Sequence, residues 1–150
     1  MTYDSLHDRM LDYLADPSQW TKKSYLIIKD PETGYVHHGA WSAAKDATPE
    51  VSKVCPKCLY GLIGLAAKDH FPGVRFKGWA DPFLTTLMMA MGEVANRLYP
   101  EAAKGGSFLL VNFNDHPATT HDEALRVVRE SREVVNQFEV LGNHWGPQSA

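Results

Sequence analysis

The sequence predicts an α+β fold, in which a small, mostly antiparallel three-stranded sheet packs with about four helices. The first observation is an almost wholly apolar run from Phe108 to Phe113, typical of a strand covered on both faces. The second is a pair of β-rich segments over 25–28 and 35–37. The third is a set of longer stretches with apolar residues at helical spacing. Because these elements do not alternate as βαβ units, the hairpin and the central strand are expected to share one sheet.

The chain begins with a predicted helix that ends at Asp16-Pro17. Its apolar side chains fall on one face: Tyr3, Leu6, Met10, Tyr13 and Leu14. A β-hairpin is expected next, because the two β-rich segments flank strong turn chemistry over 30–34. Gly34 is predicted to occupy a positive φ in that turn.

Prolines at the first helical position mark the helices in the middle of the chain. Thr48-Pro49 predicts one helix start, and Pro56 repeats the signal before an apolar stripe that continues to about residue 69. Asp81-Pro82 begins a third clear helix. The inward residues of that helix are predicted to be Leu84, Leu87, Met88, Met91, Val94, Ala95 and Leu98.

The rest of the prediction is organised around residues 107–135. The strand over 108–113 leads into a polar turn at Asn114-Asp115, where Asn and Asp side chains bond their own backbone. Thr120 and Glu123 form a predicted capping box, which begins an amphipathic last helix. Residues 1–141 are expected to form a single globular domain, with residues 142–150 as a loose C-terminal tail.

Composition and charge argue against several classes of function. A chain of 150 residues can bury a core without disulfides. A formal net charge of −3 with no basic run argues against a nucleic-acid partner. No apolar stretch is long enough to span a bilayer, and the first residues lack a signal peptide's apolar core. Two cysteines three residues apart are not a disulfide framework, so a cytoplasmic location is expected.

The Cys55-Pro56-Lys57-Cys58 motif has three interpretations. Two thiols at a helix start lie near the positive end of the helix dipole, which favours the thiolate and suits dithiol exchange. The pair could instead supply two ligands to a structural zinc ion, with two more from histidines. Those histidines would come from His37, His38, His70, His116 and His121. In the favoured interpretation, Cys58 packs as a small hydrophobic residue and no cofactor is bound.

The densest polar cluster runs from Asn114 to His121. Its position at a helix N-terminus could bind an anion through free backbone amides. Asp115 could also orient His116 or His121 as a general base. The favoured interpretation is an Asx turn followed by a helix cap at Thr120, which explains these residue types without a function.

The predicted ligand-binding residues combine this cluster with loop tryptophans and the second cysteine. They are Trp20, Trp41, Cys58, Asn114, Asp115 and Thr120. Because no constellation is complete enough for a reaction, the favoured function is non-catalytic recognition of a host protein or a small ligand. One alternative is a small enzyme with Cys58 as nucleophile and His116 or His121 as base. The other is a zinc-stabilised module held through Cys55 and Cys58.

Three short motifs carry a resemblance to a known family. They are Trp20-Thr21-Lys22, Cys58-Leu59-x-Gly61, and Asn114-Asp115-x-Pro117-x-x-Thr120 before an amphipathic helix. Together they resemble a family of small bacterial and phage proteins that is catalogued as a domain of unknown function. That family usually has Trp-Asn-Asp where this chain has Phe113-Asn114-Asp115. The resemblance implies a bacterial or phage origin and bears on the fold more than on any activity.

Overall fold

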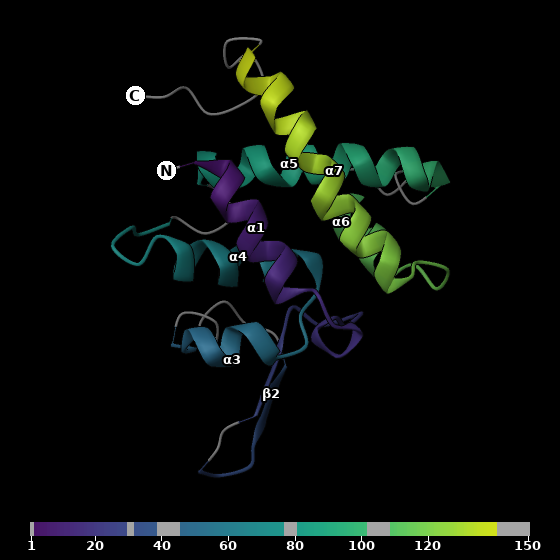
Figure 1. Ribbon diagram of the computed structural model, residues 1–150. Helices are drawn as coiled ribbons and strands as arrows, with labels where there is room; N and C mark the ends of the chain where they lie inside the picture. Colours follow the sequence, from purple (N-terminus) through teal and green to yellow (C-terminus); the bar gives the residue numbers. More distant parts are fainter. Residues whose placement is uncertain (1, 30–31, 39–45, 77–80, 102–108, 141–150) are drawn as a thin grey trace.

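The computed structural model describes residues 2–29, 32–38, 46–76, 81–101 and 109–140. Figure 1 shows these residues as layered helices with a hairpin projecting from one end. The elements in chain order are α1 (Tyr3–Tyr13), the 3₁₀ turn η1 (Pro17–Gln19), β1 (Ile27–Lys29), β2 (Val36–His38), α3 (Pro49–Val54), α4 (Leu59–His70), α5 (Pro82–Leu98), α6 (Leu109–Asp115) and α7 (His121–Val140).

The predicted α+β fold with a three-stranded sheet is wrong. The described residues are mostly helical, and their β-structure is limited to a short hairpin. The part of the run 108–113 that is described belongs to α6, which buries Leu110, Phe113 and Asn114 at helical spacing. A short apolar run does not by itself distinguish a buried strand from a buried helix. Residues 109–113, predicted as part of a central strand, are therefore part of a buried helix.

The hairpin itself forms as predicted. β1 and β2 pair antiparallel, with Ile27 opposite His38, and Gly34 has a φ of 73°. The hairpin does not pair with residues 109–113. Its base is instead attached to the segment before α4, where the Ile27 amide donates to the Pro56 carbonyl over 2.8 Å. The hairpin is therefore an extension of the helical body, as Figure 1 shows, and not part of a sheet core.

Four helices enclose the core. α7 packs across α5, and α1 packs against both α4 and α7. The apolar stripes predicted for these helices are mostly buried, and the partly buried members are Tyr3, Met88, Leu98 and Phe138. The largest fully buried apolar side chains include Phe113, Leu6, Met10, Leu14, Leu26, Leu59, Leu62, Ile63, Leu65, Leu84 and Leu87.

The helix starts predicted at Pro49, Pro82 and Thr120 are confirmed by their caps, whereas the one predicted at Pro56 is wrong, because α4 begins at Leu59 with Cys58 as its cap. Thr48 caps α3, and Asp81 caps α5, each through a side-chain oxygen that accepts a backbone amide. At the start of α7 the Glu123 amide donates to the Thr120 hydroxyl over 3.2 Å. The Thr120 amide donates in return to the Glu123 carboxylate over 3.0 Å, which completes the capping box.

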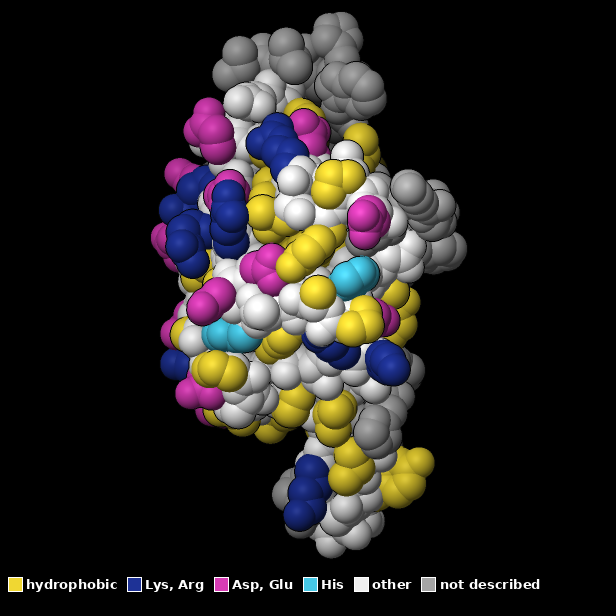
Figure 2. Space-filling view, turned by 90° about the vertical axis from the view of Figure 1, so that its right-hand side faces the viewer, with side chains coloured by type: hydrophobic (Ala, Val, Ile, Leu, Met, Phe, Trp, Pro, Cys, Tyr) yellow, Lys and Arg dark blue, Asp and Glu magenta, His cyan; other side chains and the backbone are white. Residues whose placement is uncertain are grey.

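The surface is mixed in character. Figure 2 shows acidic and basic side chains interspersed along one side of the body and hydrophobic side chains on the projecting hairpin. On the hairpin, Tyr35 and Val36 are both exposed. Among the described helices, none is both long and apolar enough to cross a bilayer.

Candidate functional site

The side chain of Asn114 joins three segments that are far apart in the sequence. Its Oδ1 accepts the Trp20 indole N–H over 2.8 Å and the Leu59 amide over 3.0 Å. Its Nδ2 donates to the Thr21 carbonyl over 3.0 Å and to the Asp115 carboxylate over 3.1 Å. These four bonds use the full hydrogen-bonding capacity of an asparagine side chain. The predicted self-bonded Asx turn is therefore wrong, because Asn114 serves as a tertiary crosslink inside α6.

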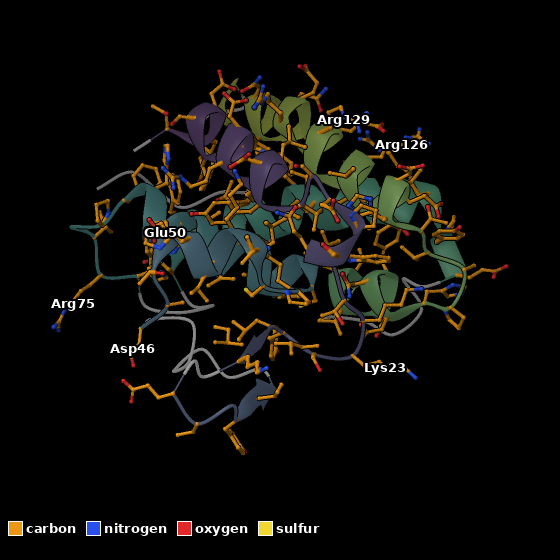
Figure 3. The ribbon with its side chains drawn as sticks, turned by 60° about the horizontal axis from the view of Figure 1, so that its bottom comes forward. Lys23, Asp46, Glu50, Arg75, Arg126 and Arg129 are labelled. Carbon is orange, nitrogen blue, oxygen red and sulfur yellow. The ribbon has the colours of Figure 1, made fainter. Side chains whose placement is uncertain are left out.

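Neighbouring residues reinforce the same junction. The Asp115 carboxylate accepts the backbone amide of Lys23 over 2.7 Å, and Lys23 has a φ of 66°. This bond helps to hold the backbone of Lys23 in a left-handed conformation that residues other than glycine rarely adopt. The Lys22 ammonium donates to the His116 carbonyl over 2.6 Å, just past the end of α6. The Lys23 side chain points away from the body, as Figure 3 shows.

Cys58 and Gly61 fix the start of α4 against the segment that precedes β1. The Gly61 amide donates to the Cys58 sulfur over 3.4 Å, and the Cys58 amide donates to the Tyr25 carbonyl over 2.9 Å. A Cβ on Gly61 would lie 2.0 Å from the Tyr25 oxygen. Only glycine allows this close approach of the two backbones.

The two cysteines are buried thiols. Burial raises the pKa of Cys58 to about 11, and it also raises the pKa of Cys55. The Cys55 thiol donates to the Ser52 carbonyl over 3.7 Å, and both cysteines are free. In the described part of the chain, no group of three or more His, Cys, Asp or Glu side chains could hold a metal ion. Both thiols therefore lie in the core, where burial favours their protonated form.

Lys57, between the cysteines, is fully buried, and the sequence analysis did not anticipate this. Its ammonium donates to the Tyr13 carbonyl over 2.6 Å, to the Lys53 carbonyl over 3.1 Å and to the Gln19 carbonyl over 3.5 Å. The carbonyls of Tyr13 and Lys53 belong to the last turns of α1 and α3, where the helix dipole favours a cation. Burial lowers the pKa of Lys57 to about 8.

The residues proposed for cysteine-dependent catalysis are engaged elsewhere. The Nε2 of His121 bonds to the Leu14 carbonyl over 2.6 Å. The His116 ring stacks on Tyr99, with ring centroids 5.3 Å apart. Within the described contacts, neither imidazole is hydrogen-bonded to Cys58. Trp20 and Asp115 both bond to Asn114, and Cys58 is the residue before Leu59, whose amide also bonds to Asn114. Thr120 caps α7 instead, and Trp41 lies outside the described residues.

Ser5, Arg9 and His70 form a hydrogen-bonded cluster, but its hydrogen bonds run in the wrong direction for His70 to act as a base on Ser5. The Nε2 of His70 lies 2.7 Å from the Ser5 hydroxyl, and its Nδ1 accepts the Nε–H of Arg9 over 3.1 Å. Because arginine can only donate, Nδ1 carries no proton, and Nε2 of the neutral ring donates to Ser5. A general base would have to accept the serine proton at that nitrogen. The cluster therefore links α1 to α4 and does not activate Ser5.

An open site lies between α4, α5 and α6, and we call it the α5 groove. It is a cavity of about 590 Å³, within the range of small-ligand sites. Its lining is largely apolar and comes from Tyr60, Met88, Met89, Gly92, Leu109 and Leu110. Its polar side chains all lie on α5 and are Thr85, Glu93, Asn96 and Arg97. The Arg97 guanidinium donates to the Glu93 carboxylate over 2.9 Å.

Gly92 is the residue of the groove that the fold does not explain. It lies in the interior of α5, where glycine costs about 1 kcal/mol relative to alanine. Among the described residues, a Cβ at this position would meet the Leu109 side chain, at 3.5 Å, which is an ordinary contact. The backbone has no positive φ there either. The described contacts therefore permit a methyl group at Gly92, in contrast to Gly61, although Gly92 lines the groove and is itself buried.

The groove was not predicted from the sequence, although the sequence contains one sign of it. Met88 was assigned to the core face of its helix, and it is half-buried beside Met89, which is 39% exposed. Two adjacent methionines followed by Gly92 make the apolar stripe of α5 wider than core packing alone requires. A stripe of that width indicates a second apolar contact surface.

Comparison with known proteins identifies a family. No curated protein and no solved structure shows a significant match to the chain. A family model described as a family of unknown function, DUF6197, matches residues 2–133, which include the Trp20, Cys58 and Asn114 motifs. The chain therefore belongs to the DUF6197 family.

Proposed function

We propose that the protein is a non-catalytic binding protein, and that its site is the α5 groove. The natural ligand is an apolar group, carried either by a small molecule or by a host protein. The observation that carries this proposal is the largely apolar cavity lined by Met88, Met89 and Gly92, where the glycine has a cost in helix stability that its described contacts do not require.

The state of the reactive side chains supports a binding role over a catalytic one. Cys58 is a buried helix cap, Lys57 is enclosed by three carbonyls, and Asn114 is saturated by its neighbours. His121 bonds to a backbone carbonyl. In contrast, the side chains of the α5 groove present apolar surface at Met88 and Met89 together with a short polar rim. That combination binds ligands through burial of apolar area and orients them by a few polar contacts.

We expect a cytoplasmic protein of a bacterium or a phage, in which Cys55 and Cys58 stay reduced. Both thiols are free and buried in the structure, which is compatible with that setting.

A neutral apolar dye tests the site without knowledge of the natural ligand. Nile red fluorescence would be titrated with the wild-type chain, Gly92→Leu and Met89→Lys. The first variant fills the groove and the second places a charge on its wall, so each is expected to weaken dye binding at least tenfold. Val54→Lys is the matched control, because Val54 is an exposed apolar residue at the end of α3, outside the groove lining.

Two outcomes of the titration would contradict the proposal. If Nile red binds the wild type and both groove variants equally, the dye site lies elsewhere and the α5 groove is not the binding site. If the wild type binds no dye at all, the groove does not accept apolar ligands. Circular dichroism of each variant shows that a loss of binding does not come from unfolding.

A further inference from the structure

We infer that the carbonyls of Tyr13, Gln19 and Lys53 form a binding site for a primary alkylammonium ion at the end of α1. In the wild-type protein the side chain of Lys57 fills this site, as a cation that is tethered to the chain. The site shares no residue with the α5 groove, so it stands or falls independently of the proposed function.

The carbonyls of Tyr13 and Lys53 lack the donor that a continuous helix would supply. The donor to Tyr13 would be the amide four residues later, but Pro17 is at that position and has no N–H. The donor to Lys53 would be the Lys57 amide, which bonds to the Gln19 carbonyl instead, over 3.0 Å. The Lys53 carbonyl accepts the Gln19 side-chain amide over 2.8 Å and has a second lone pair for a cation. The ends of α1 and α3 therefore leave carbonyl oxygens for the ammonium.

The surroundings of the Lys57 ammonium are those of a cation site. Its nitrogen lies 2.6 Å from the Tyr13 oxygen, 3.1 Å from the Lys53 oxygen and 3.5 Å from the Gln19 oxygen. It also lies 5.8 Å from the centroid of the Tyr13 ring, whose face attracts a cation. With a pKa of about 8, the group is mainly charged at pH 7. A fully buried charge is costly unless polar groups meet it, and these carbonyl dipoles do so.

The ammonium joins segments that the chain itself does not hold together. Tyr13 ends α1, Gln19 ends η1, and Lys53 lies in the last turn of α3. The backbone of Lys57 adds to the same junction, because its carbonyl accepts the Thr21 amide over 3.0 Å. A cation at this point therefore connects α1, η1 and α3 just before α4 begins, as a structural metal ion connects its ligands in other proteins.

The lysine side chain itself indicates which free ion fits the site. Lys57→Ala removes the ammonium group and all of the four-carbon stem except its first carbon, and the atoms removed are those of n-propylammonium. A free n-propylammonium ion therefore matches both the space left in this variant and its carbonyls. Lys57→Met is the contrasting variant, because its side chain fills the space and has no N–H donor.

Chemical rescue tests the site on the full chain. Thermal unfolding of Lys57→Ala at pH 7 would be followed by circular dichroism at increasing concentrations of n-propylammonium chloride. n-Propanol has the same carbon chain without the charge, and tetramethylammonium chloride has the charge without an N–H donor. Lys29→Ala is the matched control, because Lys29 is an exposed lysine on β1.

n-Propylammonium should stabilise Lys57→Ala saturably, raising its Tm by about 4 °C at about ten times its Kd. The wild type, Lys29→Ala and Lys57→Met should not respond, because their sites are already filled. If Lys57→Ala is unfolded alone, n-propylammonium should restore its helical signal. Equal effects of n-propanol or tetramethylammonium would overturn the inference, and so would an equal response of Lys29→Ala. The absence of any shift, or of refolding of an unfolded Lys57→Ala, would overturn it as well.

Discussion

The indole N–H of Trp20 donates to the side-chain oxygen of Asn114 over 2.8 Å, across 94 residues of sequence. The same oxygen also accepts the amide of Leu59 at the start of α4. One buried side chain thus ties the segment after η1 and the start of α4 to α6. The motifs that carry the family resemblance therefore meet at a structural junction, and the α5 groove lies on another part of α4 and α6.

Loss of this junction should destabilise the protein strongly. Asn114→Ala leaves the Leu59 amide and the Thr21 carbonyl without their partner, so the free energy of unfolding should fall by about 2–4 kcal/mol. The control is Asn136→Ala on the exposed face of α7, which should cost less than about 0.5 kcal/mol. Urea unfolding followed by circular dichroism measures both. Similar costs for the two variants would show that Asn114 is not a crosslink.

Two glycines should respond in opposite ways to the same substitution. Gly61→Ala places a Cβ 2.0 Å from a backbone oxygen and should cost more than about 3 kcal/mol or prevent folding. Gly92→Ala makes only an ordinary contact and should stabilise the protein by up to about 1 kcal/mol through helix propensity. Thermal unfolding of the two variants tests the pair. A destabilised Gly92→Ala would mean that the fold requires this glycine, and the space in the groove would need no functional reason.

Lys57 should make stability depend on pH on the alkaline side. Burial lowers its pKa to about 8, from an ordinary value of 10.5. Between these values the unfolded chain holds a proton that the folded chain lacks, so the free energy of unfolding contributed by Lys57 rises with pH. The slope is at most about 1.4 kcal/mol per pH unit. Urea unfolding of the wild type and of Lys57→Met at pH 8, 9 and 10 isolates this contribution, because the thiols and tyrosines are common to both.

The difference between the wild type and Lys57→Met should therefore increase from pH 8 to pH 10. Lys57→Met should also be less stable throughout, because the carbonyls of Tyr13 and Lys53 lose their donor. A difference that stays constant or shrinks with pH would show that the ammonium keeps its proton well above pH 8.

His7 should make the stability of the protein depend on pH below neutrality. It is fully buried between α1 and α7, where its Nδ1 bonds to the Tyr3 carbonyl over 2.8 Å and its Nε2 lies 3.0 Å from the Ser131 hydroxyl. Burial lowers the pKa of His7 below 6.5. As the pH falls through 6.5 the unfolded chain takes up a proton first, so stability is lost. Between pH 7.5 and pH 5.5 the wild type should therefore lose more stability than His7→Gln, by at most about 1.4 kcal/mol per pH unit. Equal losses in urea unfolding would contradict this.

Local sequence patterns predicted the features that depend on local contacts. The hairpin turn at Gly34, the caps at Thr48, Asp81 and Thr120, and the buried stripes of the long helices all follow from residues a few positions apart. The run that became α6 failed because a seven-residue helix is too short to show its period. Its helical form is fixed by what it packs against, and a strand at the same place would satisfy the apolar pattern equally well.

The junction and the groove depend on contacts that no local pattern contains. Asn114 and Asp115 have typical turn residue types, yet their partners are Trp20 and Lys23, which tertiary folding alone brings near. The burial of Lys57 could not be predicted either, because a lysine is almost always exposed unless several acceptors bind its ammonium group. The groove is lined by residues of α4, α5 and α6, which only the tertiary fold brings together. Within the sequence, the one sign of it is that Met88 and Met89 are followed by Gly92 in the same helix.

Nuclear magnetic resonance offers the most direct test of where the protein binds its ligand. In a ¹H–¹⁵N spectrum the backbone amides of Met89, Gly92 and Leu109 report on the groove, while the Trp20 indole N–H and the Asn114 side-chain amide report on the junction. Titration of the full chain with indole, a small apolar probe, should shift the groove signals and leave the two junction signals in place. Shifts of the Trp20 and Asn114 signals, with Gly92 unchanged, would contradict the account and return the site to the residues that the sequence first indicated.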